Sequence, residues 1–180
     1  MTTETSWNLS VTRPPKPRFD AHTLENHVLS DGEGLPPSYV SFVQAFGWGR
    51  LFGLWLVYTP VPLGHADGLL GRGGRLTARL REEFGQWQNE GYDWAVKPDG
   101  SWETPQRLEV FAMSENGDYL AWDTGSRDPH GEVQIYHTSR FSSLTRIGGD
   151  LHEAVEALRV RDAGATPPAA DFDPLDLSAL

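Results

Sequence analysis

The dipeptide Asn116-Gly117, set between two apolar stretches, is the feature that most constrains the fold of this chain. Asn-Gly supplies the two positive-φ positions of a type I′ turn, which joins neighbouring antiparallel strands. The flanking stretches RLEVFAM and DYLAWDT have the length and composition of strands. We therefore predict an antiparallel hairpin of Arg107–Met113 and Asp118–Thr124. A third stretch, Glu132–His137, alternates with period two and should pair in the same sheet.

Helical patterns lie on both sides of this hairpin. Apolar residues at helical spacing predict helices over 20–29, 36–47, 73–91 and 148–160. Asp150 and Glu153 have the spacing of a capping box at the start of the last of these. The continuous apolar run 50–62 predicts one buried strand. Because helices and strands are grouped and do not alternate, we predict an α+β fold, a single domain with an antiparallel sheet packed against helices.

The two ends of the chain differ in composition from its body. Residues 1–19 include the basic, proline-rich segment TRPPKPRF, which cannot be helical and predicts a flexible arm. Residues 162–180 are rich in Ala, Pro and Asp and carry four acids and no base, which predicts a flexible acidic tail. Residues 20–161 are then left as the folded domain, which is long enough to bury a substantial core.

The charge balance narrows the choice of partner. With 15 basic and 25 acidic residues the formal net charge is −10, and the isoelectric point is near 4.9. Such a chain repels a phosphate backbone, so direct nucleic-acid binding is not expected, whereas a basic protein would be attracted. No stretch resembles a signal peptide or a membrane span, so we expect a cytoplasmic protein that does not contact membranes.

The residues for catalysis or metal binding do not occur in the required patterns. The chain has no cysteine, which excludes disulfides, thiolate nucleophiles and Cys-ligated zinc. The stretch HEAVE lacks the second histidine of a zinc helix, and no Gly-x-Ser-x-Gly nucleophile motif is present. The glycine-rich stretch 71–74 lacks the Lys-Ser/Thr ending of a phosphate loop and is expected to be a flexible connector. We expect no catalytic residue, no metal and no other cofactor.

Acidic side chains crowd around the predicted turn. Asp118 and Asp123 are five positions apart, so they face opposite sides of a regular strand and cannot form a glycosidase pair within it. We predict instead a partner-binding surface made of Glu115, Asp118, Asp123, Asp128, Trp48 and Trp122. In the alternative interpretation, Asp118 and Asp123 cap strand ends and Trp122 lies in the core.

Three motifs of this chain, taken in order, resemble those of the SUKH superfamily. The motifs are a helix that begins at LPPSYVSF and ends at glycine, a strand pair around GDYLAWD, and SSL followed by the last helix. The matching residues are Leu35, Pro36, Tyr39 and Phe42, then Gly117, Asp118, Leu120 and Asp123, then Ser143, Leu144 and the helix from Leu151. The resemblance covers residues 20–160. The chain departs from the pattern at Gly47-Trp48-Gly49, where a glycine pair is usual, and in its longer segment 60–102.

The resemblance implies an immunity protein, since many bacterial members of this superfamily bind and neutralise a toxin made by the same cell. Such toxins are often nucleases or deaminases, and a net charge of −10 suits a partner with a basic surface. Other members are regulatory scaffolds, so a general protein-interaction module without a toxin is the alternative. A carbohydrate-active enzyme is a third hypothesis, but the seven tryptophans are spread over the chain as in a core. The identity of the toxin and the oligomeric state are left open.

Overall fold

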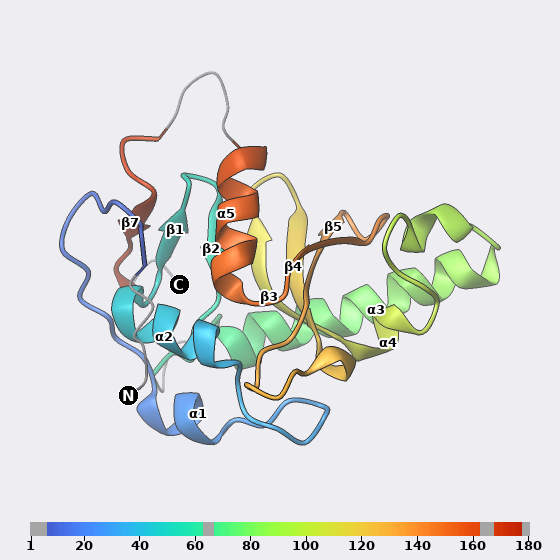
Figure 1. The fold of residues 1–180 in the computed structure, drawn as a ribbon, viewed down its shortest axis with the longest axis horizontal. Coiled ribbons are helices and arrows are strands. Elements are labelled where there is room, and N and C mark those ends of the chain that lie inside the picture. Colours follow the sequence, from blue (N-terminus) through green and yellow to red (C-terminus); the bar gives the residue numbers. More distant parts are fainter. Residues whose placement is uncertain (1–6, 63–66, 163–167, 178–180) are drawn as a thin grey trace.

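The computed structural model describes residues 7–62, 67–162 and 168–177, and its centre is a seven-stranded antiparallel sheet (Figure 1). The strands are β1 (Gly49–Leu51), β2 (Trp55–Val57), β3 (Leu108–Ser114), β4 (Asp118–Asp123), β5 (Ile135–Ser139), β6 (Thr145–Gly148) and β7 (Phe172–Pro174). Their order across the sheet is β6-β5-β4-β3-β2-β1-β7. Mixed helices and an antiparallel sheet in one domain confirm the predicted α+β class.

The predicted hairpin is present at the centre of the sheet. Strands β3 and β4 pair antiparallel, and Gly117 has φ of 85° in the turn between them. The turn is not the predicted type I′, because the φ of Asn116 is not positive. The N–H of Gly117 donates to the Ser114 carbonyl, and a left-handed glycine closes a three-residue loop over 115–117. The third predicted strand also pairs in this sheet, but β5 begins at Ile135, three positions later than expected. The difference arises because the carboxylate of Asp128 accepts hydrogen bonds from the backbone N–H groups of His130 and Glu132, which hold this stretch in a loop.

The apolar run 50–62 is not the single strand that we predicted. It forms two short strands, β1 and β2, which pair with each other across a tight turn. Phe52 and Gly53 have φ of 52° and 69°, so the chain reverses within the apolar stretch. Hydrophobicity alone shows that the segment is buried; it does not show a reversal in which a phenylalanine takes an unusual backbone conformation.

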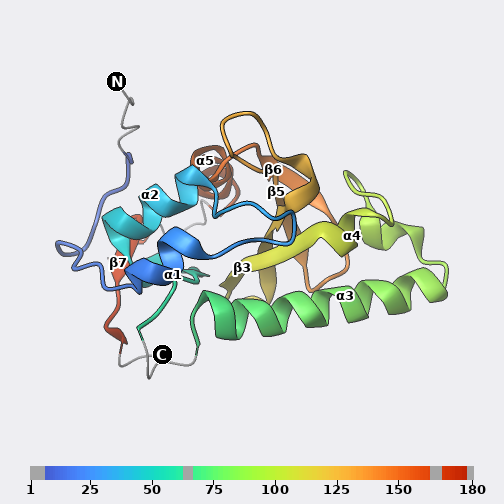
Figure 2. The ribbon, with the colours of Figure 1, turned by 90° about the horizontal axis from the view of Figure 1, so that it is seen from below.

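Helices cover both faces of the sheet. They are α1 (Ala21–Asn26), α2 (Pro37–Phe46), α3 (Gly74–Asn89), α4 (Thr104–Arg107) and α5 (Leu151–Arg161). Figure 2 shows α2 and α5 on one side of the sheet and α3 on the other. The Asp150 carboxylate accepts from the backbone N–H of Glu153, as the capping box predicts. The glycines at 71–74, expected in a flexible connector, lie in a π-helical turn, η1 (Leu69–Gly73), and the start of α3.

The described parts of both chain ends are packed against the domain, so the predicted boundaries at residues 20 and 161 are wrong. Strand β7 pairs with β1 and covers an edge that would otherwise be open, and the side chain of Phe172 is fully buried. The backbone of residues 10–12 hydrogen-bonds to Phe172. Trp7 packs edge-on against Phe42, with ring centroids 5.3 Å apart. A few apolar residues, such as Trp7 and Phe172, thus hold these two segments against the domain, although their overall composition is typical of disordered chains.

The core lies between the sheet and the helices on its two faces. Its largest fully buried side chains include Trp55, Trp122, Tyr39, Phe42 and Phe111. Within the described residues, no helix combines the length and the hydrophobicity that a membrane crossing requires.

Candidate protein-binding surfaces

The two tryptophans predicted as exposed anchors lie in the core. Trp122 is 1% exposed and stacks on Phe111, with ring centroids 4.3 Å apart. Trp48 is 6% exposed and stacks on Tyr58. Strand β4 is covered by helices on both faces, so even its alternate positions are removed from water. The prediction that Trp48 and Trp122 belong to a binding surface is therefore wrong.

Asp123 is also a structural residue. Its side chain is 4% exposed and receives hydrogen bonds from Arg107 Nε at 2.8 Å and Nη2 at 3.1 Å. The backbone N–H of Gly125 donates to the same carboxylate, which starts the 3-10 turn η3 (Thr124–Ser126). The hydrogen bonds that Arg107 donates to the carboxylate raise the pKa of Arg107. Asp123 therefore ends strand β4, as the alternative interpretation proposed.

Asp118 points to the opposite face of the sheet, as its odd spacing from Asp123 predicts. Its carboxylate lies 3.4 Å from His137 Nε2 and 3.8 Å from Arg161 Nη2, at the C-terminal end of α5. His137 is 2% exposed, and burial together with the nearby Arg161 charge lowers its pKa, although Asp118 opposes this shift. Asp118 thus holds α5 against the hairpin and is mostly enclosed, with 16% of its side chain exposed.

Of the predicted acids, Glu115 and Asp128 remain at the surface. The Glu115 side chain is 53% exposed and forms an ion pair with Arg50 at 2.6 Å. Asp128 lies in the loop between β4 and β5, where it accepts backbone hydrogen bonds. The six predicted residues thus divide between the core, both faces of the sheet and a loop, and they form no continuous surface.

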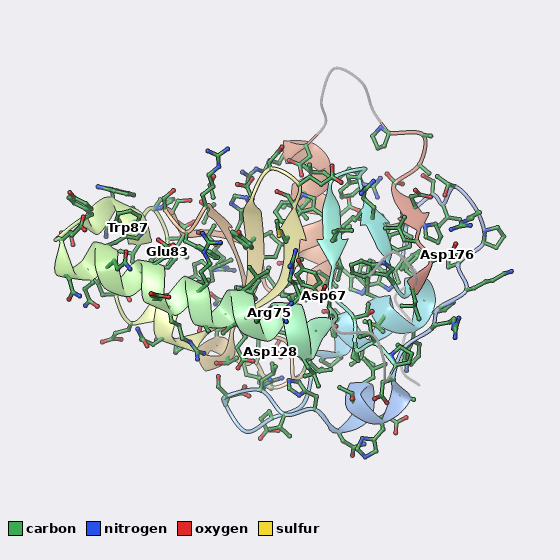
Figure 3. The ribbon with its side chains drawn as sticks, turned by 180° about the vertical axis from the view of Figure 1, so that it is seen from behind. Asp67, Arg75, Glu83, Trp87, Asp128 and Asp176 are labelled. Carbon is green, nitrogen blue, oxygen red and sulfur yellow. The ribbon has the colours of Figure 1, made fainter. Side chains whose placement is uncertain are left out.

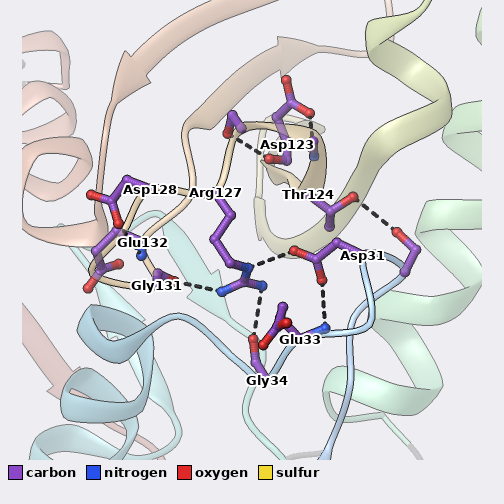
Figure 4. A network of polar contacts seen from close by, with 12 residues as sticks. Asp31, Glu33, Gly34, Asp123, Thr124, Arg127, Asp128, Gly131 and Glu132 are labelled. Carbon is purple, nitrogen blue, oxygen red and sulfur yellow. Dashed lines mark hydrogen bonds and ion pairs between the residues drawn. The ribbon is translucent and has the colours of Figure 1, made fainter.

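A second polar network, which the sequence did not indicate, joins two loops (Figure 4). Arg127 donates from Nε to Asp31 at 2.6 Å, from Nη1 to the Gly131 carbonyl at 2.6 Å and from Nη2 to the Gly34 carbonyl at 3.0 Å. The side chains of Arg127 and Asp31 are only 16% and 17% exposed. The hydrogen bonds to Asp31 and Gly34 join residues that are 96 and 93 positions apart in the chain, so no local motif predicts them. The network fixes the loop before α2 against the loop after β4.

The adjoining Glu132 is held in a similar way. It accepts from the backbone N–H and the hydroxyl of Ser38, both at 2.7 Å, and so caps the start of α2. Burial raises the pKa of Glu132, although these hydrogen bonds lower it. Because Glu132 is partly buried and bound to Ser38, its role is structural.

Aromatic side chains gather at the projecting end of α3. Trp87, Tyr92, Trp94 and Trp102 form this group, which we term the aromatic tip. The rings of Tyr92 and Trp94 are stacked with centroids 5.6 Å apart, and Trp87 lies 5.6 Å from Trp94. Tyr92 is 41% and Trp94 51% exposed, which is unusual for such large apolar groups. Figures 1 and 3 show that this end of α3, which carries Trp87, extends to one side of the sheet.

The aromatic tip is held in place by hydrogen bonds and by buried neighbours. Trp87 Nε1 donates to the Phe141 carbonyl at 2.9 Å, and Trp102 Nε1 donates to Asp93 at 3.0 Å. The 3-10 helix η2 (Asp93–Val96) carries Trp94 outward while Ala95 and Val96 are buried beneath it. A rigid aromatic surface loses little conformational entropy when a partner binds.

The surroundings of the aromatic tip are acidic. Glu90, Asp93 and Glu103 are exposed in the same stretch of the chain as Tyr92 and Trp94, and so is the base Lys97. A second exposed base, Arg140, adjoins Phe141, whose carbonyl accepts the hydrogen bond of Trp87. The sequence interpretation placed Trp48 and Trp122 on a binding surface, treated the spread of the seven tryptophans as a sign of core packing, and missed this surface. The available signal was the density of Tyr92, Trp94 and Trp102 in a stretch without helix or strand periodicity.

Within the described ranges, no three His, Asp or Glu side chains lie close enough together to bind one metal ion. Comparisons of the chain with models of protein families, with curated proteins and with solved structures give no match. The SUKH resemblance therefore stays a prediction from the motifs.

Proposed function

We propose that this protein is a non-enzymatic binding protein of the immunity type, which neutralises a bacterial toxin with a basic surface in the cytoplasm. The observation that carries the proposal is the aromatic tip, with stacked Tyr92 and Trp94 exposed beside acidic side chains. Tyrosine and tryptophan dominate the binding energy of many protein interfaces, because they bury a large area with few rotatable bonds.

The charge of the protein supports a basic partner. A net charge of −10 accelerates the approach of a positively charged surface, and the acids around the aromatic tip add to this attraction locally. A nuclease, or another enzyme that modifies nucleic acid, needs a basic cleft to hold phosphate. In this proposal the aromatic tip supplies affinity and the acidic residues supply association rate and specificity.

A growth experiment tests the proposed function. The secreted protein encoded by the neighbouring open reading frame is produced in bacteria with or without this chain. We expect growth arrest by the toxin alone, rescue by the wild-type chain, and loss of rescue by the Tyr92→Ala, Trp94→Ala double variant. Val160→Ala is the matched control, because Val160 is 79% exposed on α5, away from the aromatic tip.

The outcomes separate the competing functions. Rescue by the control variant and not by the double variant, together with direct binding of the two purified proteins, supports the immunity function. A neighbouring protein that is harmless, or whose toxicity this chain does not relieve, contradicts it. In that case the scaffold alternative predicts binding of the aromatic tip to a protein that does not arrest growth.

A further inference from the structure

A cleft at the other end of α3 has the size and composition of a small-molecule site. It lies between the loop after α1, the π-helical turn η1 and strand β3, and its volume is about 340 Å³. Ligand pockets typically start near this volume. The ion pair of Arg75 with Asp67, labelled in Figure 3, marks the same end of α3. The cleft is lined by residues of the first half of α3, up to Arg81, whereas the aromatic tip lies at the other end of this helix.

The mouth of the cleft is apolar. Val28 and Leu70 line it, and they are 54% and 53% exposed. Exposed branched side chains on two sides of one cleft favour an apolar group between them. Gly74 lines the cleft as well, and a Cβ atom placed there would meet no atom within 4 Å. The glycine thus leaves open space at the entrance.

The wall of the cleft holds hydrogen-bond donors without acceptors. Trp122 lines it, is 1% exposed, and its Nε1–H has no partner within the described ranges. Arg81 Nε likewise has none. Among the described residues this guanidinium makes a single hydrogen bond, a long one of 3.4 Å from Nη2 to the Leu108 carbonyl. No carboxylate of the described chain lies within ion-pair distance of Arg81. Buried donors of this kind are costly unless an acceptor reaches them.

A negative charge lies in the same cleft. Glu109 accepts the backbone N–H of Ser30 with Oε1 at 2.7 Å, and its second oxygen has no hydrogen bond in the described part of the chain. Glu109 and Arg81 do not pair with each other, although both line the cleft. A simple anion would be attracted by Arg81 and repelled by Glu109, whereas a ligand that carries both charges satisfies both side chains.

We propose that this cleft binds a small apolar zwitterion, of which a branched-chain α-amino acid is the simplest example. The carboxylate of the ligand is placed at Arg81, its ammonium group at Glu109, and its side chain between Val28 and Leu70. The site is independent of the proposed toxin binding, because it shares no residue with the aromatic tip.

Nuclear magnetic resonance tests the proposal directly through the indole N–H signal of Trp122, assigned by its loss in Trp122→Phe. Titration with L-leucine should shift this signal to saturation at millimolar concentrations. Three comparison compounds each lack one feature: 4-methylpentanoate lacks the ammonium group, isopentylamine lacks the carboxylate, and glycine lacks the side chain. We expect each to bind at least about tenfold more weakly than leucine. The absence of a saturable shift with leucine, or equal binding of any of the three, would overturn the proposal.

Substitutions locate the site. Gly74→Phe should abolish the leucine response and leave the unfolding midpoint nearly unchanged, because Gly74 has helical φ of −61° and open space around it. Gly85→Phe is the matched control: it lies on α3, also with no atom within 4 Å of a Cβ, and should bind leucine as the wild type does. Glu109→Gln keeps an acceptor for Ser30 but removes the charge. It should weaken leucine binding and strengthen the binding of 4-methylpentanoate, because the repulsion between the two carboxylates is lost. Unchanged binding by Gly74→Phe or Glu109→Gln contradicts the assignment.

Discussion

Two tryptophans of this protein each stand next to an aspartate, and the two pairs have opposite fates. Trp122-Asp123 ends the central strand β4 and is buried, with Trp122 stacked on Phe111 and Asp123 paired to Arg107. Asp93-Trp94 lies in the short 3-10 helix η2, where Trp94 is half exposed. A tryptophan next to an acid in the sequence therefore does not indicate a binding surface unless the strands and helices that pack around it are known.

The number of layers around each pair explains the contrast. Strand β4 lies between β3 and β5 in the sheet, and helices cover both faces. The 3-10 helix η2 is supported from one side only, through its buried residues Ala95 and Val96. The buried pair serves stability, while the exposed pair leaves aromatic area in water that a partner can cover.

The largest expected effect is the loss of stability in Trp122→Ala. Removing this fully buried side chain leaves a cavity among Tyr39 and Phe111, and we expect a decrease of about 3–5 kcal/mol in the free energy of unfolding. Urea denaturation followed by circular dichroism measures the change. A decrease below about 1 kcal/mol would mean that the hairpin tryptophan is not a core residue, and the contrast with Trp94 would fail.

Next in size is the effect of Asp123→Asn. The substitution removes the negative charge that faces Arg107. Because the Asp123 side chain is only 4% exposed, this ion pair contributes to stability, but solvent reduces the contribution because Arg107 is 40% exposed. We expect a loss of about 1–2 kcal/mol. The matched control is Glu115→Gln in the same hairpin, whose exposed pair with Arg50 should contribute less than about 1 kcal/mol. Equal effects on thermal unfolding would contradict the separation of the hairpin acids into buried and exposed.

The sequence predicted local features of the fold much better than it predicted the site. The turn at Gly117, the cap of α5 at Asp150 and the apolar face of α2 are set by neighbours in the chain, and all were found from their spacing. The burial of Trp122 depends on helices on both faces of the sheet, and the position of β7 depends on Phe172 reaching the far edge. These are long-range contacts, which composition and period do not encode. The same limit explains why the sequence did not indicate the aromatic tip.

A third effect concerns the turn that joins the buried strands. Gly117 has φ of 85°, a conformation that a β-branched residue resists, so Gly117→Val should lower stability by about 1 kcal/mol or more. A Cβ atom would have room, since its nearest neighbour would be 3.7 Å away on Arg140. The cost therefore comes from the backbone alone. Gly117→Asn, which tolerates this region, should cost less, and equal losses for the two variants would point to packing instead.

A further prediction concerns pH and the buried His137, which faces Asp118, Arg161, Asp162 and Trp55. Burial lowers its pKa from the ordinary 6.5, so the unfolded chain takes up a proton at a pH where the folded chain does not. The free energy of unfolding is therefore highest above pH 6.5, where the imidazole is neutral in both states. It decreases as the pH falls from 6.5 through the lowered pKa of the folded protein.

Urea midpoints at about pH 7.5 and about pH 5.5 measure this loss, and His137→Gln provides the comparison. The wild-type chain should lose more stability between these values than the variant, because only the wild type has a buried imidazole to protonate. The exposed histidines are common to both proteins and cancel. The same pH dependence in both would show that His137 does not titrate differently on folding.

The smallest change in stability is expected for Trp94→Ala, on the exposed side of the comparison. Half of this side chain is already in water, and its contacts are with Tyr92 and Trp87, so the loss should be about 1 kcal/mol or less. Its effect on partner binding should be far larger than on stability, and on dissociation more than on association, as for an interface anchor. Asp93→Asn should instead slow association at low salt, with the difference shrinking as salt screens the charge. A loss of several kcal/mol in stability for Trp94→Ala would place this residue with Trp122, and the aromatic tip would then belong to the core.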